Sequence, residues 1–181
     1  MNKIMMIRVY ALPLHVVIFL MLALLVLWAV LSMRIRKNKW PVINAAINLI
    51  VVFFVIRSTI LTRTPGDYEL ILMPFAAFAA AKQQPELYRE MLMNVFLFFP
   101  MGLTLSNALP CRWRISVRIG VTVLVGCVVS VGIEFIQYRF ALGTAETDDV
   151  ICNTLGTFIG SLSLLTALAC EKLKEKLGTR K

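Results

Sequence analysis

Long runs of apolar residues, separated by short polar connections, dominate the pattern along this chain. A helix needs about 20 residues to cross the ~30 Å hydrocarbon core of a bilayer. Five runs of about that length occur, and they extend from Ala11 to about Met33, from Trp40 to about Leu61, from Met91 to Leu109, from Ile115 to Gln137 and from Val150 to Cys170. The pattern therefore predicts five transmembrane helices.

A further apolar stretch covers only residues 70–81 and is interrupted by Pro74. It is too short to cross a bilayer alone, and irregular backbone exposed to lipid would leave polar groups unsatisfied. We expect it to form a re-entrant or interfacial segment packed against the other helices. The predicted fold class is an all-α polytopic membrane helix bundle of about five transmembrane helices with this short segment.

The composition agrees with a membrane protein. Of the 181 residues, 59% are hydrophobic and only 16% are charged, too few polar residues to coat a water-soluble globule. The four cysteines have no CxxC spacing and no nearby histidine cluster, so no disulfide framework and no metal site are predicted. No phosphate-binding loop, hydrolase motif or basic and aromatic patch is present. The expected partner is the lipid bilayer and not nucleic acid, and the cofactor is unknown.

The distribution of basic residues predicts an orientation. With the C-terminus in the cytoplasm, 12 Lys and Arg residues lie on the cytoplasmic side and 6 on the outer side. This is the asymmetry of the positive-inside rule, although Lys3 and Arg8 oppose it weakly. We predict that the N-terminus is outside and the C-terminus cytoplasmic.

Polar residues of the later spans gather at the predicted outer end. In the fourth span Ser130, Glu134 and Gln137 follow the spacing i, i+4, i+7, which places them on one helical face. Asn94 lies near the outer end of the third span. A buried carboxyl is costly in hydrocarbon, so Glu134 should face the bundle.

The fifth span repeats this arrangement. Asp149, Asn153, Gly156 and Gly160 share one face that starts at the outer end. The small residues of Gly156-x-x-x-Gly160, and of Gly126-x-x-x-Ser130 in the fourth span, favour close helix packing. We expect them to bring the fourth and fifth spans together, so that Glu134 approaches Asp149.

Two interpretations of these polar residues stay open. They can hydrogen-bond across helices only to hold the bundle together, or they can form a binding site. If Glu134 and Asp149 are close, a shared proton or a bound cation becomes plausible. Arg57, in the second span, can either reach the membrane interface or pair with Glu134.

The ordered motifs resemble the VanZ-like family of bacterial membrane proteins. The resemblance covers about residues 58–163 and lies in Leu72-Met73-Pro74-Phe75, Asn94-Val95-Phe96-Leu97-Phe98-Phe99-Pro100-Met101-Gly102, Ser130 with Glu134 and Gln137, Gly143-Thr144-Ala145-Glu146, and Asp149-Val150-Ile151-Cys152-Asn153-Thr154-Leu155-Gly156 with Gly160. It divides the chain into an N-terminal two-helix region (1–57), a VanZ-like core (58–163) and the end of the last helix with a basic cytoplasmic tail (164–181). Asp148 is extra acidity beside the matching Asp149.

The resemblance implies a multi-pass protein of the bacterial cell membrane, from a family whose named member is associated with low-level teicoplanin resistance. Together with the residue pattern it predicts a set of ligand-binding residues, namely Asn94, Ser130, Glu134, Gln137, Glu146, Asp149 and Asn153. A second set is predicted to be structural, namely Pro74, Phe75, Pro100, Gly102, Gly156 and Gly160. No catalytic residue is assigned.

Three functions are compatible with these residues. The first is binding of an envelope lipid or a lipoglycopeptide at the outer-leaflet site, with a contribution to teicoplanin resistance. The second is a membrane enzyme acting on a polyprenyl-phosphate or another envelope lipid, with Glu134 and Asp149 as acid and base or as ligands of Mg²⁺. A small transporter is weaker, because the polar residues crowd one end instead of lining a path.

Overall fold

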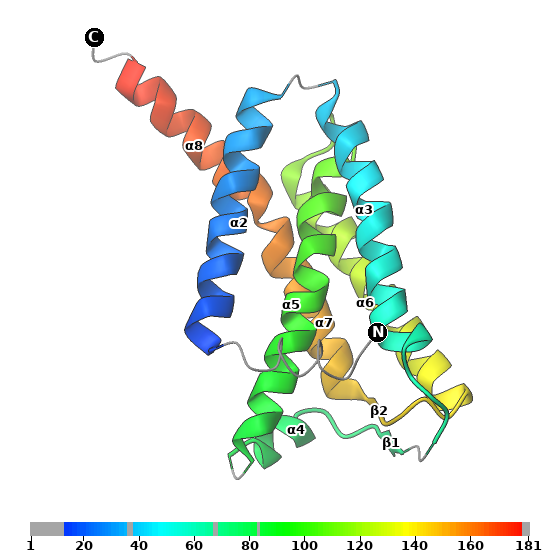
Figure 1. Cartoon of the computed structure of the whole chain (residues 1–181). Coiled ribbons are helices and arrows are strands. Elements are labelled where there is room, and N and C mark those ends of the chain that lie inside the picture. The colour runs from blue at the N-terminus through cyan, green and yellow to red at the C-terminus, as the bar shows by residue number, and fades with distance from the viewer. Residues whose placement is uncertain (1–12, 36–37, 67–68, 83, 179–181) are drawn as a thin grey trace.

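The computed structural model describes residues 13–35, 38–66, 69–82 and 84–178 (Figure 1). Along the chain, the described elements are α2 (Leu14–Arg34), α3 (Trp40–Ile56), the π-helical turn η1 (Arg57–Leu61), β1 (Leu70–Ile71), α4 (Ala76–Ala80), α5 (Pro85–Ala108), α6 (Ile115–Arg139), β2 (Ala145–Glu146), α7 (Thr147–Ser161) and α8 (Ser163–Gly178).

Within the described part of the chain, five helices are long and apolar enough to cross a membrane, which confirms the predicted polytopic bundle. Their bounds are His15–Arg34, Trp40–Leu61, Glu86–Ala108, Ile115–Arg139 and Thr147–Leu173. The third helix starts earlier than predicted, at Pro85 instead of near Met91, because hydropathy marks where apolar residues begin and not where helical hydrogen bonding begins. The fifth span is divided at Leu162, where α7 ends and α8 begins.

The predicted short segment is present and has three parts. It consists of β1, an irregular turn that contains Pro74, and the single-turn helix α4. Figure 1 shows β1, α4 and β2 together at one end of the bundle, while α8 extends away from the other end. We call the end that contains β1, α4 and β2 the acidic end.

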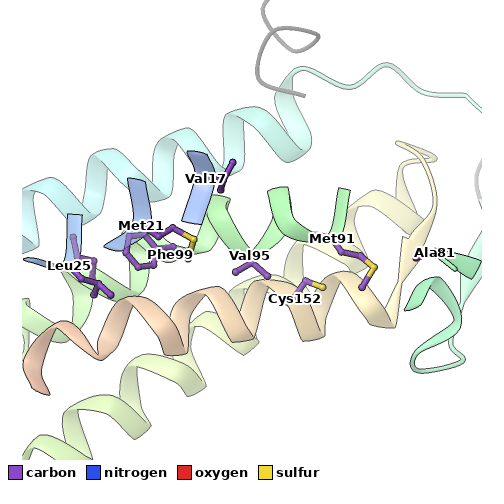
Figure 2. Close-up of a cluster of buried hydrophobic side chains, with 9 residues drawn as sticks. Val17, Met21, Leu25, Ala81, Met91, Val95, Phe99 and Cys152 are labelled. Carbon is purple, nitrogen blue, oxygen red and sulfur yellow. The ribbon is translucent and has the colours of Figure 1, made fainter. Parts of the chain in front are cut away.

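Helix α5 is the centre of the bundle. It packs against α2, α3, α6, α7 and α8, most extensively against α7. An apolar cluster lies along it, and Figure 2 shows these side chains in a row that runs from Leu25 to Ala81. Its buried members are Val17, Met21 and Leu25 of α2, Met91, Val95, Phe99 and Leu103 of α5, Cys152 of α7, and Ala81.

Glycines allow the backbones of α5 and α7 to touch. A side chain on Gly156 would collide with the carbonyl oxygen of Val95, and one on Gly160 with the carbonyl oxygen of Phe99. From the other helix, Gly102 faces the backbone of Thr157 in the same way. Contact this close excludes even a methyl group, so these positions require glycine.

This arrangement corrects part of the sequence-based expectation. Gly156 and Gly160 were expected to pack against the fourth span, but they pack against α5, the third. Of the small residues singled out in the sequence, Gly126 of α6 does face α7, because a side chain there would collide with the side chain of Thr157. The helical period shows which residues share a face, but it does not show which neighbour that face meets.

A second set of buried polar side chains lies in the half of the bundle opposite the acidic end. The Trp28 indole donates to Asn44 Oδ1 (2.8 Å), and the Trp40 indole donates to Asn107 Oδ1 (3.0 Å). Asn107 Nδ2 in turn donates to Ser163 Oγ (2.9 Å). These bonds link α2 to α3, α3 to α5 and α5 to α8.

Arg118 belongs to the same half. It lies in the first turn of α6, and its Nε and Nη2 donate to the carbonyl oxygen of Ser106 (3.1 and 2.7 Å). Ser106 is in the last turn of α5, where helix carbonyls lack intrahelical partners. The prediction that polar residues crowd one end is therefore wrong. Sequence reasoning counted Arg118 among the basic residues of the cytoplasmic side and did not predict that its side chain is buried.

The α5–α7 contact leads to a test with paired glycines. We expect Gly156→Ala to lower the free energy of unfolding by roughly 1–3 kcal/mol, because the methyl group must push the two backbones apart. Gly132→Ala on α6 is the control, since no atom lies near its Cα, and it should be neutral or stabilising by up to about 1 kcal/mol. Thermal unfolding in detergent measures both, and equal effects would contradict the contact.

Candidate functional site

The acidic end is assembled by a short parallel pairing of β1 with β2. Leu70 lies opposite Ala145 and Ile71 opposite Glu146, and the N–H of Ala145 donates to the carbonyl of Glu69 (2.9 Å). The pairing brings the segment after α3 beside the start of α7. Two regions far apart in sequence are thus held next to each other.

Two side-chain hydrogen bonds join α7 to both of its neighbours. Asn94 Nδ2 of α5 donates to Asp149 Oδ1 (2.6 Å). One turn further along α7, Asn153 Nδ2 donates to Ser130 Oγ of α6 (2.9 Å). The first turns of α7 therefore lie between α5 and α6, with polar contacts on each side.

Glu134 faces the bundle and not the lipid, since its side chain is only 9% exposed. Its Oε2 accepts a hydrogen bond from the N–H of Glu146 in β2 (3.1 Å). The carboxylate of Asp149 is close enough for the two charges to repel, and the Arg63 guanidinium acts on both. The structure thus brings Glu134 and Asp149 together, as their helical faces predicted.

Gln137 and Asn153 each have an amide oxygen without a partner. Gln137 Nε2 donates to the carbonyl of Thr59 in η1 (3.0 Å), whereas no described residue donates a hydrogen bond to Gln137 Oε1 or Asn153 Oδ1. The two side chains are 2% and 4% exposed. A buried polar atom without a partner costs about 1–3 kcal/mol, so two near one site require an explanation.

Asp148 connects the start of α7 to the turn before α4. Its Oδ1 accepts from the N–H of Phe75 (2.6 Å) and its Oδ2 from the N–H of Ala77 (2.7 Å). Phe75 has a left-handed backbone (φ 63°), which is costly for a residue with a side chain. The two charge-assisted bonds stabilise this conformation.

Sequence reasoning missed this role of Asp148. It treated the residue as extra acidity beside Asp149, yet Asp148 is 2% exposed and makes two hydrogen bonds. Adjacent residues of a helix point about 100° apart, so Asp148 and Asp149 had to face different neighbours. This was the available signal, but it did not identify those neighbours.

The turn held by Asp148 is strongly apolar. Leu72, Met73 and Phe75 are between 61% and 71% exposed. We call residues 72–75 the apolar turn. Buried polar side chains and an exposed apolar surface therefore lie at the same end of the molecule.

The connection between α6 and β2 closes the site beside Arg63. Arg63 Nη1 donates to the carbonyl of Leu142 (3.2 Å). Gly143 has φ 124°, and a side chain there would collide with the Arg63 guanidinium. The backbone conformation therefore requires glycine here, whereas the flexible Arg63 side chain would only have to shift to admit a larger residue.

The remaining residues of the two predicted sets are distributed as follows. Pro100 and Gly102 lie further along α5, where the Pro100 carbonyl accepts from Thr104 Oγ1 (2.8 Å) and Gly102 contacts α7. Gly156 and Gly160 belong to the same helix contact. Among residues 13–35, 38–66, 69–82 and 84–178, no group of three or more His, Cys, Asp or Glu side chains is placed to hold a metal ion.

Comparison with known proteins agrees with this architecture. Residues 16–168 match the VanZ/LLP1 family. The chain belongs to the VanZ/LLP1 family. Protein VanZ of Enterococcus faecium is 38% identical over 73 residues, which is 40% of this chain and 42% of that protein. That match thus spans less than half of the relative. No solved structure matches the chain.

The VanZ/LLP1 match extends beyond the motifs that pointed to the family. Those motifs lie within residues 58–163, whereas the match also includes α2, α3 and the first turn of α8. The division of the chain at residues 57 and 163 stays a prediction.

The contact of Asp148 with the apolar turn can be tested by hydrogen exchange. In Asp148→Ala the amides of Phe75 and Ala77 lose their acceptor, and we expect their exchange to accelerate about tenfold or more. Asp149→Ala is the matched control, because Asp149 makes no hydrogen bond to those amides. Mass spectrometry of peptides from this segment measures the effect, and unchanged exchange in Asp148→Ala would contradict the contact.

Glu146 predicts a pH dependence of stability in this VanZ/LLP1 protein. Burial, followed by the charges of Asp148, Glu90 and Glu69, raises its pKa. The folded chain therefore keeps this proton to a higher pH than the unfolded chain, and the free energy of unfolding falls as pH rises from the ordinary glutamate pKa through the raised one.

The Glu146→Gln side chain stays neutral at every pH, so the variant should lack the loss of unfolding free energy that comes from ionisation of Glu146. We expect its unfolding temperature to equal that of the wild type near about pH 4 and to exceed it near about pH 8. Glu171→Gln, at an exposed position of α8, should show no such divergence. A constant difference between Glu146→Gln and wild type across this range would refute the assignment.

Proposed function

We propose that this VanZ/LLP1 protein binds an amphiphile at the acidic end and thereby contributes to teicoplanin tolerance or to the handling of an envelope lipid. The main supporting observation is a buried polar network next to an exposed apolar surface. Asn94, Asp149 and Glu134 form the first part, and the apolar turn, tied to α7 by Asp148, forms the second.

The depth of the site in the membrane supports this proposal. His15–Arg34 of α2 spans about 30 Å, the thickness of the hydrocarbon core. Val17, in the first turn of this span, packs in the same cluster as Cys152 of α7. We expect Val17 and the start of α7 to lie near one boundary of the core, with Asp149 about one turn closer to the acidic end than Cys152.

The apolar turn lies between β1 and α4, and we expect it to lie beyond this boundary, at the level of the lipid headgroups. Apolar and aromatic side chains at such a level insert between headgroups and acyl chains. An amphiphile in the same leaflet can place its polar part against Asp149 and its apolar part against Phe75. With the predicted orientation, this leaflet is the outer one.

Teicoplanin-type antibiotics have the corresponding chemistry, because they combine an acyl chain with a polar peptide core. The acyl chain places them in the leaflet where the site lies. Vancomycin has no such chain. A protein that binds the drug through both parts should therefore protect against the lipidated compound more than against the other.

A membrane enzyme acting on a polyprenyl-phosphate is the second candidate. The proximity of the Glu134 and Asp149 carboxylates favours it, since paired carboxylates with different surroundings can serve as acid and base. Two carboxylates repel a phosphate, however, and Arg63 is the nearby cation that acts on both of them. The network thus fits binding of an uncharged or cationic group more directly than binding of a phosphate.

Antibiotic tolerance in a susceptible Gram-positive host tests the proposal. Expression of the wild-type chain should raise the inhibitory concentration of teicoplanin several-fold more than that of vancomycin, for the reason given above. Glu134→Gln should abolish the difference, whereas the exposed Glu171→Gln should keep it. Equal protection against both drugs, or full protection by Glu134→Gln at wild-type membrane abundance, would count against binding at this site.

A further inference from the structure

The three amide NH₂ groups of the polar site at the acidic end each donate a hydrogen bond within the protein. The Asn94 amide donates to the Asp149 carboxylate, and the Gln137 amide donates to the Thr59 carbonyl. Both partners can only accept, so in each case the NH₂ group must face the partner. The Asn153 amide donates to Ser130 Oγ. Each of these NH₂ groups has two N–H donors, and the described hydrogen bond uses one of them.

Two amide oxygens of the same site have no hydrogen-bond donor among the described residues. Gln137 Oε1 and Asn153 Oδ1 are buried without a hydrogen-bond partner. On α6, Gln137 lies about one turn after Glu134, and Ser130, the partner of Asn153, lies one turn before it. The two unpartnered oxygens thus belong to residues that lie on either side of the Glu134 carboxylate.

The carboxylates contribute further acceptor capacity and negative charge. The charge of Asp149 acts on the Glu134 carboxyl, and a hydrogen bond is described to only one oxygen of each side chain. A bound group with positive charge and several N–H donors would remove the repulsion and satisfy the unpartnered oxygens together. An anionic group would be repelled by the carboxylates and would leave the unpartnered oxygens without a donor.

We infer that the acidic end recognises a primary ammonium group on its ligand, held by Glu134 and Asp149 with Gln137 Oε1 and Asn153 Oδ1 as further acceptors. The inference rests on the proposed amphiphile site and specifies its polar half. An ammonium group has three N–H donors in a compact charge, which matches a site of oxygens that lie on several helices.

A membrane lipid supplies this chemistry in phosphatidylethanolamine, and a soluble amine supplies it without the acyl chains. The apolar turn favours the lipid, because Leu72 and Phe75 are exposed at the headgroup level. The Arg63 guanidinium, whose charge reaches both carboxylates, is a cation that can pair with the phosphate of the same headgroup.

An N-methylation series of one lipid isolates the N–H donors from the charge. The full chain is reconstituted in nanodiscs with equal amounts of phosphatidylcholine and of phosphatidylethanolamine or its mono- or dimethyl derivative. Mass spectrometry then counts the lipids that stay bound after extraction with detergent. We expect about tenfold enrichment of phosphatidylethanolamine over phosphatidylcholine, falling with each N–H replaced by methyl.

Variants test whether the named residues are responsible. Glu134→Gln and Asp149→Asn keep the shape of each side chain and remove its charge, and both should reduce the enrichment to near one. Glu171→Gln, on α8 at the other end of the bundle, should retain it. Use of two separate variants keeps the test decisive if one of them fails to fold.

Other results would overturn the inference. Equal retention of phosphatidylethanolamine and phosphatidylcholine would exclude N–H recognition, and preference for phosphatidylglycerol would indicate an anion site. Thermal stabilisation by Mg²⁺ alone, without preference among the lipids, would indicate a metal site instead of an ammonium site.

Displacement of the lipid by millimolar ethanolamine would support the ammonium site and show that a soluble amine also enters it.

The lipid experiment and the tolerance experiment test different claims, and a negative result in one does not imply a negative result in the other. Selective teicoplanin protection without lipid enrichment would refute ammonium recognition and leave the amphiphile site in place. Lipid enrichment without teicoplanin protection would support the ammonium site and direct the proposed function to envelope lipid handling. Absence of both would refute the site itself.

Discussion

The backbone contact between α5 and α7 is the constraint on which the rest of the structure depends. Gly156 and Gly160 allow α7 to touch α5 without intervening side chains. This closeness lets Asn94 reach Asp149 directly at 2.6 Å. It also places α7 against α6 within reach of Ser130. A wider separation of the helices would leave these polar side chains buried without partners, at a cost of several kcal/mol.

Buried polar groups at both ends hold the bundle around its apolar centre. In one half, Trp40, Asn107 and Ser163 connect α3, α5 and α8, and their hydrogen bonds are made within the protein. At the acidic end the network is incomplete, because Gln137 Oε1 and Asn153 Oδ1 lack partners. Thr122 Oγ1, in the half of α6 opposite the acidic end, and Thr154 Oγ1 of α7 also lack partners. The two amide oxygens differ from these hydroxyls because they belong to residues near the Glu134 carboxylate, and this position supports the proposed ligand site.

The polar site and the apolar turn are also mechanically joined. Glu146 gives its N–H to Glu134, and Asp148, two residues later, binds the backbone of Phe75. The start of α7 therefore connects a buried carboxylate to a surface segment that is more than 70 residues distant in sequence. A ligand that bridges the two surfaces would contact one continuous unit, so the cost of ordering it on binding stays small.

Hydropathy and helical period by themselves determined the membrane spans and the shared face of Ser130, Glu134 and Gln137, because both depend on local sequence. They also predicted that Glu134 approaches Asp149, whose charge acts on Glu134 in the structure. The function of these residues stays a proposal. Only the tertiary structure decided that Gly156 packs on α5, that Asp148 holds Phe75, and that Arg118 is buried. The physical reason is that a helical period defines the direction of a side chain relative to its own axis, whereas its partner depends on how the other helices are placed around that axis.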